Sequence, residues 1–151
     1  MKYYFKTSEK EKTFQDIYIE FIKPQIEDID ILLKCDTPPY DVSQVASVLH
    51  TTSNEVITIM NKLNISEIGM QEFFFILKNA DTYISNLILR QWKFNSVKEY
   101  TPLHISYIYN LNEADVKKAF EQLKVNTVNE KNLYKIFNLI ILKSYISKFQ
   151  E

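Results

Sequence analysis

The chain has 151 residues, with 18 Lys and Arg against 19 Asp and Glu and a formal net charge of −1. Its length suits one compact domain or two very small ones. The chain has no excess of basic residues of the kind that indicates binding to nucleic acid. A single Gly excludes Gly-rich phosphate loops, and with only 4 Pro the chain has few turn residues for a β-sandwich or barrel.

The location of the protein is predicted from its cysteine content and hydropathy. Cys35 is the only cysteine, so no internal disulfide can form, which fits a reducing compartment. The start has no apolar signal region, and Lys135 and Lys143 interrupt the most apolar stretch. We expect a cytoplasmic protein with no membrane segment. Abundant Lys, Ile, Asn and Tyr indicate an AT-rich genome, and we expect a bacterial or phage source.

The first predicted element is a long N-terminal helix. Ser8 followed by Glu11 forms a plausible capping box, and apolar residues at helical spacing continue to about Leu33. Pro24 lacks a backbone donor and predicts a kink or break in this helix. The residues 36–39, Asp-Thr-Pro-Pro, then read as a linker.

The middle of the chain predicts four shorter helices. The first covers 43–49 and is followed by a corner at 50–52, and the second runs from an N-cap at Ser53 to Leu63. After a connector over 64–68, Gly69 opens the third helix. Asp81 caps the fourth, which runs from Thr82 to about Trp92.

The last third of the chain predicts three further helices. Thr101 is a good N-cap with Pro102 at the first helical position, and this helix ends near Tyr109. Asn112 caps a helix to about Lys124. Residues 129–149 then read as one long C-terminal helix that is apolar over a wide arc, which requires burial.

An apolar pattern recurs at an offset of 60 residues. Few of the paired residues are identical, so the match is one of spacing, but it suits two short helices meeting at a corner and followed by a third helix. The matching pairs are Tyr40 and Tyr100, Val45 and Ile105, Val48 and Ile108, Leu49 and Tyr109, Val56 and Val116, Met60 and Phe120, Leu63 and Leu123, Ile65 and Val125, Ile68 and Val128, Phe73 and Leu133, Phe74 and Tyr134, and Ile76 and Ile136.

Both copies carry the three positions that a helix-turn-helix needs. These are a small residue where the first helix touches the second, a corner residue that tolerates positive φ, and a branched apolar residue that anchors the second helix. Asn and His are among the non-Gly residues enriched at positive φ. The three positions are Ala46, His50 and Val56 in the first copy, and Ser106, Asn110 and Val116 in the second.

The stretch Asp41-Val42-Ser43-Gln44-Val45-Ala46-Ser47-Val48-Leu49, with Thr52-Ser53-Asn54-Glu55-Val56, resembles the helix-turn-helix of excisionase-like and MerR-like DNA-binding proteins. The resemblance covers roughly 25 residues per copy. It implies two tandem DNA-binding modules, whose recognition helices, Ser53–Leu63 and Asn112–Lys124, would enter the major groove.

The outward positions of these helices are the candidate DNA contacts. We expect Val56, Ile59, Met60 and Leu63 to point inward on the first helix. Asn and Gln suit adenine edges, Lys suits guanine or phosphate, and an apolar side chain suits a thymine methyl. Lys117 and Lys118, with Arg90 and Lys93 upstream, give the second module most of the positive charge. The candidate contacts are Thr52, Ser53, Asn54, Ile57, Thr58, Asn61, Lys62, Asn112, Lys117, Lys118, Gln122, Arg90 and Lys93.

Catalytic and metal chemistry have little support in the sequence. His50, His104 and Cys35 show no metal-ligand spacing, and no carboxylate pair stands out for acid–base work. We expect no catalytic residue, no metal and no cofactor. Cys35, at an apolar helix end, is expected to be a small core residue.

These patterns predict an all-α protein with tandem helix-turn-helix modules flanked by long N- and C-terminal helices. The expected segments are an N-terminal helical segment over 1–39, a first module over 40–78, a connecting helix and linker over 79–99, and a second module with the C-terminal helix over 100–151. The expected function is a sequence-specific regulator that binds double-stranded DNA, with a homodimer through the terminal helices as one option. The alternative is a protein-interaction adaptor that keeps the fold without binding DNA.

Overall fold

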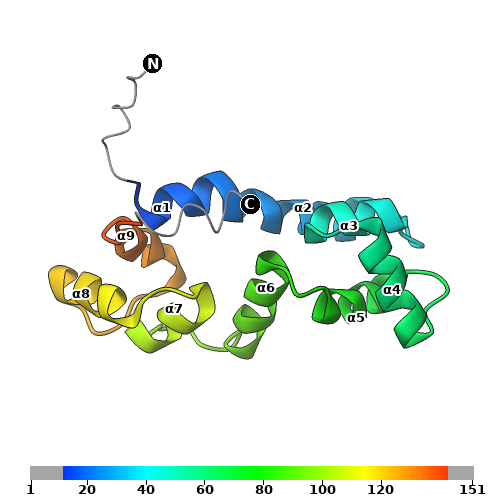
Figure 1. Ribbon diagram of the computed structural model, residues 1–151. Coiled ribbons are helices and arrows are strands. Elements are labelled where there is room, and N and C mark those ends of the chain that lie inside the picture. Colours follow the sequence, from blue (N-terminus) through cyan, green and yellow to red (C-terminus); the bar gives the residue numbers. More distant parts are fainter. Residues whose placement is uncertain (1–11, 143–151) are drawn as a thin grey trace, which may run out of the picture. The chain divides into compact units, whose positions relative to one another are not determined.

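The computed structural model describes residues 12–142, and these residues form an all-α fold of eight helices. A long helix over 14–35 is built from α1 (Phe14–Ile17), the π-helical η2 (Tyr18–Ile22) and α2 (Lys23–Cys35). The other elements, shown in Figure 1, are α3 (Val42–Leu49), α4 (Ser53–Leu63), α5 (Met70–Ala80), α6 (Tyr83–Lys93), α7 (Pro102–Tyr109), α8 (Glu113–Leu123), the 3₁₀ turn η3 (Glu130–Asn132) and α9 (Leu133–Phe137).

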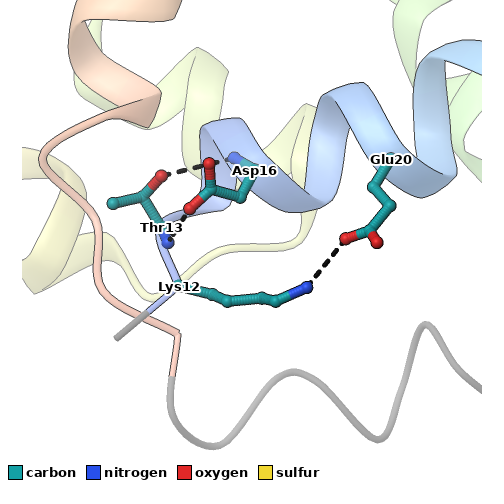
Figure 2. A network of polar contacts seen from close by, with 4 residues as sticks. All are labelled: Lys12, Thr13, Asp16 and Glu20. Atoms are coloured by element: carbon teal, nitrogen blue, oxygen red, sulfur yellow. Dashed lines mark hydrogen bonds and ion pairs between the residues drawn. The ribbon is translucent and has the colours of Figure 1, made fainter. Parts of the chain in front are cut away.

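The long N-terminal helix begins at Phe14, with Thr13 as its N-cap. The Thr13 hydroxyl accepts from the Asp16 backbone N–H, and the Asp16 carboxylate accepts from that of Thr13, so the two residues form a capping box. Lys12, which precedes the helix, forms an ion pair of 2.8 Å with Glu20 inside it (Figure 2). The capping box expected at Ser8 and Glu11 lies outside the described residues.

The expected irregularity at Pro24 falls one turn earlier. The helix remains continuous through Pro24, and residues Tyr18–Ile22 widen into a π-helical turn. A proline ring crowds the carbonyl four residues before it, and here that carbonyl belongs to Glu20, inside the π turn. The widened turn therefore lies where the proline removes the regular hydrogen bond.

The chain divides into two compact units, one of residues 22–93 and one of residues 1–21 with 94–151. In the unit of residues 22–93, α2 packs on α3, α3 on α4, α4 on α5, and α5 on α6. The Thr82 hydroxyl donates to the Leu49 carbonyl at 2.8 Å and ties the start of α6 to the end of α3. Apolar side chains from the four shorter helices, such as Leu49, Phe73 and Leu87, fill the core.

The other unit joins the start of the described chain to its end. Thr13 and Ile141 form an isolated antiparallel bridge, in which the Phe14 N–H donates to the Ile140 carbonyl at 2.8 Å. Phe14 makes edge contacts with Phe137 at a ring-centroid distance of 4.7 Å and with Tyr109 at 5.9 Å. Aromatic contacts of this kind, between α1, α7 and α9, form the centre of this unit.

The 60-residue repeat is present in the backbone as well as in the sequence. The helices α3 and α4 start and end 60 residues before α7 and α8. Left-handed residues follow the helices at equivalent places, His50 with Asn110 and Asn64 with Lys124. The bridge of Tyr40 with Ile68 likewise recurs as that of Tyr100 with Val128. The predicted repeat and both predicted positive-φ corners are therefore confirmed.

The C-terminal helix expected over 129–149 is wrong in its described part. A 3₁₀ turn precedes α9, which ends at Phe137, and Ile141 lies in the bridge with Thr13. The backbone groups after Phe137 bond to the N-terminal segment, since the Leu142 N–H donates to the Lys12 carbonyl at 3.0 Å. A long-range pairing thus replaces the helix that local apolar spacing favours, and residues 143–151 lie outside the described part.

Several smaller expectations need correction. Asp81 is the left-handed residue that ends α5, and the Thr82 hydroxyl accepts from the Ser85 N–H at the start of α6. Cys35 is exposed and is not a core residue, because it lies at the last position of α2 beside the linker. Among the described residues, no helix is both long and apolar enough to cross a membrane.

Candidate nucleic-acid interface

Helix α4 presents one face to the core and the other to solvent. Val56 is 0% exposed and Ile59 is also buried, so the helix is anchored from its middle. Leu63, which was expected to point inward, is 37% exposed because the helix ends there and the chain turns at Asn64. All seven candidate contacts of this module are exposed: Thr52, Ser53, Asn54, Ile57, Thr58, Asn61 and Lys62.

The N-cap of α4 lies one residue before the position predicted from the sequence. Thr52 is the N-cap, and its hydroxyl accepts from the Glu55 N–H at 3.1 Å, while Ser53 is the first helical residue. One turn further, the Thr58 hydroxyl donates to the Asn54 carbonyl at 2.9 Å. Thr52 and Thr58 thus fix the shape of the helix, and Asn54, Ile57 and Asn61 lie on its solvent side.

Helix α8 has the same anchoring and a different surface. Val116 is 0% exposed, and Ala119 and Phe120 are buried beside it. Asn112 is exposed, but its side chain caps the helix by accepting from the Asp115 N–H at 3.1 Å. Lys117 pairs with Glu113 at 3.2 Å, an exposed pair that stabilises the helix little.

The remaining cationic candidates divide between the two units. Lys118 and Gln122 are exposed on α8 and line a cavity together with residues 139–141. Arg90 and Lys93 lie in the last turn of α6, in the same unit as α4, and the Arg90 guanidinium lies 6.0 Å from the Tyr83 ring centroid. The structure therefore places the candidates of one predicted charge cluster in two different units.

The two exposed helix faces differ in charge. The exposed residues of α4 include one acid, Glu55, and one base, Lys62. Those of α8 include three acids, Glu113, Asp115 and Glu121, with Lys117 and Lys118 as bases. Carboxylates in a first helical turn stabilise the helix through its dipole, but they repel a phosphate at that end. The first turn of α4 carries one carboxylate and the first turn of α8 carries two.

The neutral polar face of α4 has the chemistry for reading base edges. Asn54 and Asn61 can donate and accept at once, as recognition of adenine requires, and Ile57 can meet a thymine methyl group. Ile57 is 44% exposed, so this apolar contact is available to a partner. Within residues 12–142, no group of three or more His, Cys, Asp or Glu side chains is placed to hold a metal ion.

One surface feature near these helices has no counterpart in the sequence patterns. Beyond α4, a groove is lined by Leu63 and Ile65 together with Pro39 and residues at the start of α5. The apolar spacing placed Leu63 in the core, but α4 ends at this residue, and its side chain lines the groove together with Pro38 and Pro39 of the linker. Comparisons with known protein families, curated proteins and solved structures find no match to this chain.

Proposed function

We propose that the protein is a sequence-specific DNA-binding regulator without catalytic activity, and that each corner-joined helix pair is a helix-turn-helix module. One observation carries the proposal. The same arrangement occurs twice: a left-handed corner residue is followed by a helix that has a fully buried valine on one face and exposed residues on the opposite face. A helix held in this way is suited to enter the major groove of DNA.

In this proposal α4 reads the bases and α8 supplies phosphate contacts. The face of α4 offers amide and hydroxyl groups with a single Lys, which suits hydrogen bonds to base edges better than attraction to phosphate. On α8, Lys117 and Lys118 are the available cations, and Lys117 exchanges its partner Glu113 for a phosphate. Because so few cations are involved, the dependence of affinity on salt should be shallow.

The function is tested by selecting from a pool of randomised DNA duplexes at low salt and titrating the selected site across a salt series. The expected result is enrichment of one motif. The double variant Lys117→Glu, Lys118→Glu should weaken binding. It should also reduce the slope of log affinity against log salt concentration by the amount expected for about two lost phosphate contacts. An affinity and salt slope that this double variant leaves unchanged would refute the role of α8.

A protein-interaction adaptor is the second candidate function, and the surface of α8 favours it. Three exposed acids on that helix, two of them in its first turn, oppose a phosphate backbone and suit a protein partner. The two candidates differ in the selection experiment, because an adaptor enriches no motif at any salt concentration.

A homodimer through the N-terminal helix belongs to the same proposal. Ile19 and Ile31 are both about half exposed on this helix, at 50% and 55%. The C-terminal helix that was expected to share the interface ends at Phe137 in the described part. Light scattering of the wild-type chain and of an Ile19→Ser, Ile31→Ser variant tests the dimer, and the variant should be the smaller species.

A further inference from the structure

The surface beyond α4 is hollowed into a groove between the 36–39 linker, the end of α4 and the start of α5, here called the α4–α5 groove. Its volume is about 550 Å³, and the residues that matter here are Pro39, Leu63, Ile65, Glu67, Glu72 and Phe75. Leu63 and Phe75 are 37% and 38% exposed. Two large apolar side chains are thus partly open to solvent at the same place.

The repeat supplies a natural comparison. A second groove lies at the equivalent positions of the other unit, between the residues before α7, the end of α8 and the start of α9. This α8–α9 groove is smaller, at about 200 Å³. The Thr127 hydroxyl donates to the Glu99 carboxylate at 2.9 Å, so a hydrogen bond joins two of its lining residues. The corresponding residues of the α4–α5 groove are Glu67 and Pro39, which cannot make this bond.

The two grooves have also diverged in charge. The α4–α5 groove is lined by Glu67 and Glu72 and by no basic residue. At the same positions the α8–α9 groove has Thr127 and Asn132, and Lys135 replaces Phe75. Of the two, only the α4–α5 groove therefore combines two carboxylates with an exposed aromatic ring.

The Glu72 carboxylate lies at the start of α5, where it bonds to the backbone of Gly69. The Gly69 N–H donates to Glu72 Oε1 at 3.1 Å, and a Cβ at residue 69 would lie 2.7 Å from the same oxygen. In the other unit Asn129 takes the place of Gly69 and caps the helix with its own side chain, accepting from the Asn132 N–H. The only glycine of the chain thus lies in the α4–α5 groove, where the Glu72 carboxylate is present, whereas the other groove has Asn132 at that position.

We propose that the α4–α5 groove binds a cationic segment of a partner protein, in which Lys or Arg residues flank a bulky apolar side chain. The apolar side chain packs between Leu63 and Phe75, and the cations face Glu67 and Glu72. Complementary charge favours this occupant, and an Arg gains further from the face of Phe75. The same carboxylates repel the phosphate backbone, so this surface is separate from the proposed DNA contacts on α4.

The test uses the full-length chain and a labelled peptide, Lys-Lys-Phe-Lys-Lys, followed by fluorescence anisotropy and by shifts of backbone amide resonances. Peptides with Ala in place of Phe, or Glu in place of Lys, are the ligand controls. We expect binding of the Phe-containing cationic peptide alone, with the largest shifts at Leu63, Ser66 and Phe75. The affinity should fall as salt is raised.

Variants that give the α4–α5 groove the lining of its counterpart provide the matched comparison. Glu67→Thr and Glu72→Asn should each weaken the affinity for the peptide by about threefold, as expected for ion pairs that are partly open to solvent. Thr127→Val in the other groove should leave affinity unchanged, and circular dichroism checks that every variant folds. Equal affinity for the Ala peptide, equal shifts in both grooves, or shifts caused by raising the concentration of the protein alone would each overturn the proposal.

Discussion

The helix pair α3–α4 and the helix pair α7–α8 have the same backbone plan and almost no common surface. Their buried positions are filled by similar residues, such as Val45 with Ile105 and Val56 with Val116. Most of their outward positions differ, as in Ile57 with Lys117 and Asn61 with Glu121. Burial restricts the residues that hold a corner together, whereas exposed positions are free to acquire separate binding roles.

The cores of the two units also differ in their side chains. Leu49 and Leu77 of one unit correspond to Tyr109 and Phe137 of the other, where Phe14 adds a third ring. Phe14→Ala should lower the free energy of unfolding by about 3–5 kcal/mol, since a fully buried ring is lost. Urea unfolding followed by circular dichroism should show the loss.

The only tryptophan makes this prediction specific to one unit. Trp92 lies in the unit of residues 22–93, where its ring packs 5.3 Å from that of Phe74. Its fluorescence transition should move less for Phe14→Ala than for Phe73→Ala, which removes a ring from its own unit. Equal shifts for both variants would mean that the two units unfold as one.

The equivalence of the two anchors can be measured directly. Val56→Ala and Val116→Ala should each cost about 2 kcal/mol, because two methyl groups leave a fully buried site. Ile57→Ala, at the next position of α4, is exposed and should change stability by less than about 0.5 kcal/mol. A large difference between the two valines in urea unfolding would break the equivalence of the repeats.

The corner residues should respond alike to a change of backbone preference. His50 and Asn110 have φ of 58° and 56°, a region that a β-branched residue strongly disfavours. His50→Val and Asn110→Val should each cost about 1–2 kcal/mol, and the matching Gly variants should be neutral or slightly stabilising. Thermal unfolding of the four variants checks this, and a well-tolerated valine at one corner would show that its turn is not constrained.

The smallest expected effect is a dependence of stability on pH through Tyr100 in the second repeat. Burial, with a further contribution from Glu130, raises the pKa of Tyr100 above its ordinary value of 10.0. The folded state thus favours the neutral phenol, and this stabilisation is present below pH 10 and is lost as pH rises through the raised pKa. Above about pH 10 the wild type should lose stability relative to Tyr100→Phe, and parallel curves for the two proteins would contradict the assignment.

Much of the helical fold could be predicted from local signals. Asn112, Thr101 with Pro102, and Gly69 marked helix starts correctly, because capping depends on neighbouring backbone groups alone. The positive-φ corners were also predicted, since few residue types tolerate that conformation. The exposed face of α4 then followed from the helical period.

Other features depend on contacts between distant residues and could not be read locally. The run after Phe137 has good helical spacing, yet it pairs with Lys12 and Phe14 at the other end of the chain. Leu63 has the spacing of a core residue, yet it lines a groove formed with the linker. Local signals also do not show that Arg90 and Lys93 belong to a different unit from Lys117 and Lys118, although they are near in sequence.

The most direct test uses two variants. One is a double variant of α4 that carries both Asn54→Ala and Asn61→Ala, and the other is Gln122→Ala on α8. Each is titrated with the selected duplex and a scrambled duplex at about 50 mM salt. The account predicts that the α4 variant lowers the ratio of selected to scrambled affinity by at least about tenfold, while Gln122→Ala has little effect. A ratio unchanged by the α4 variant, or a wild-type chain that binds neither duplex, would contradict it.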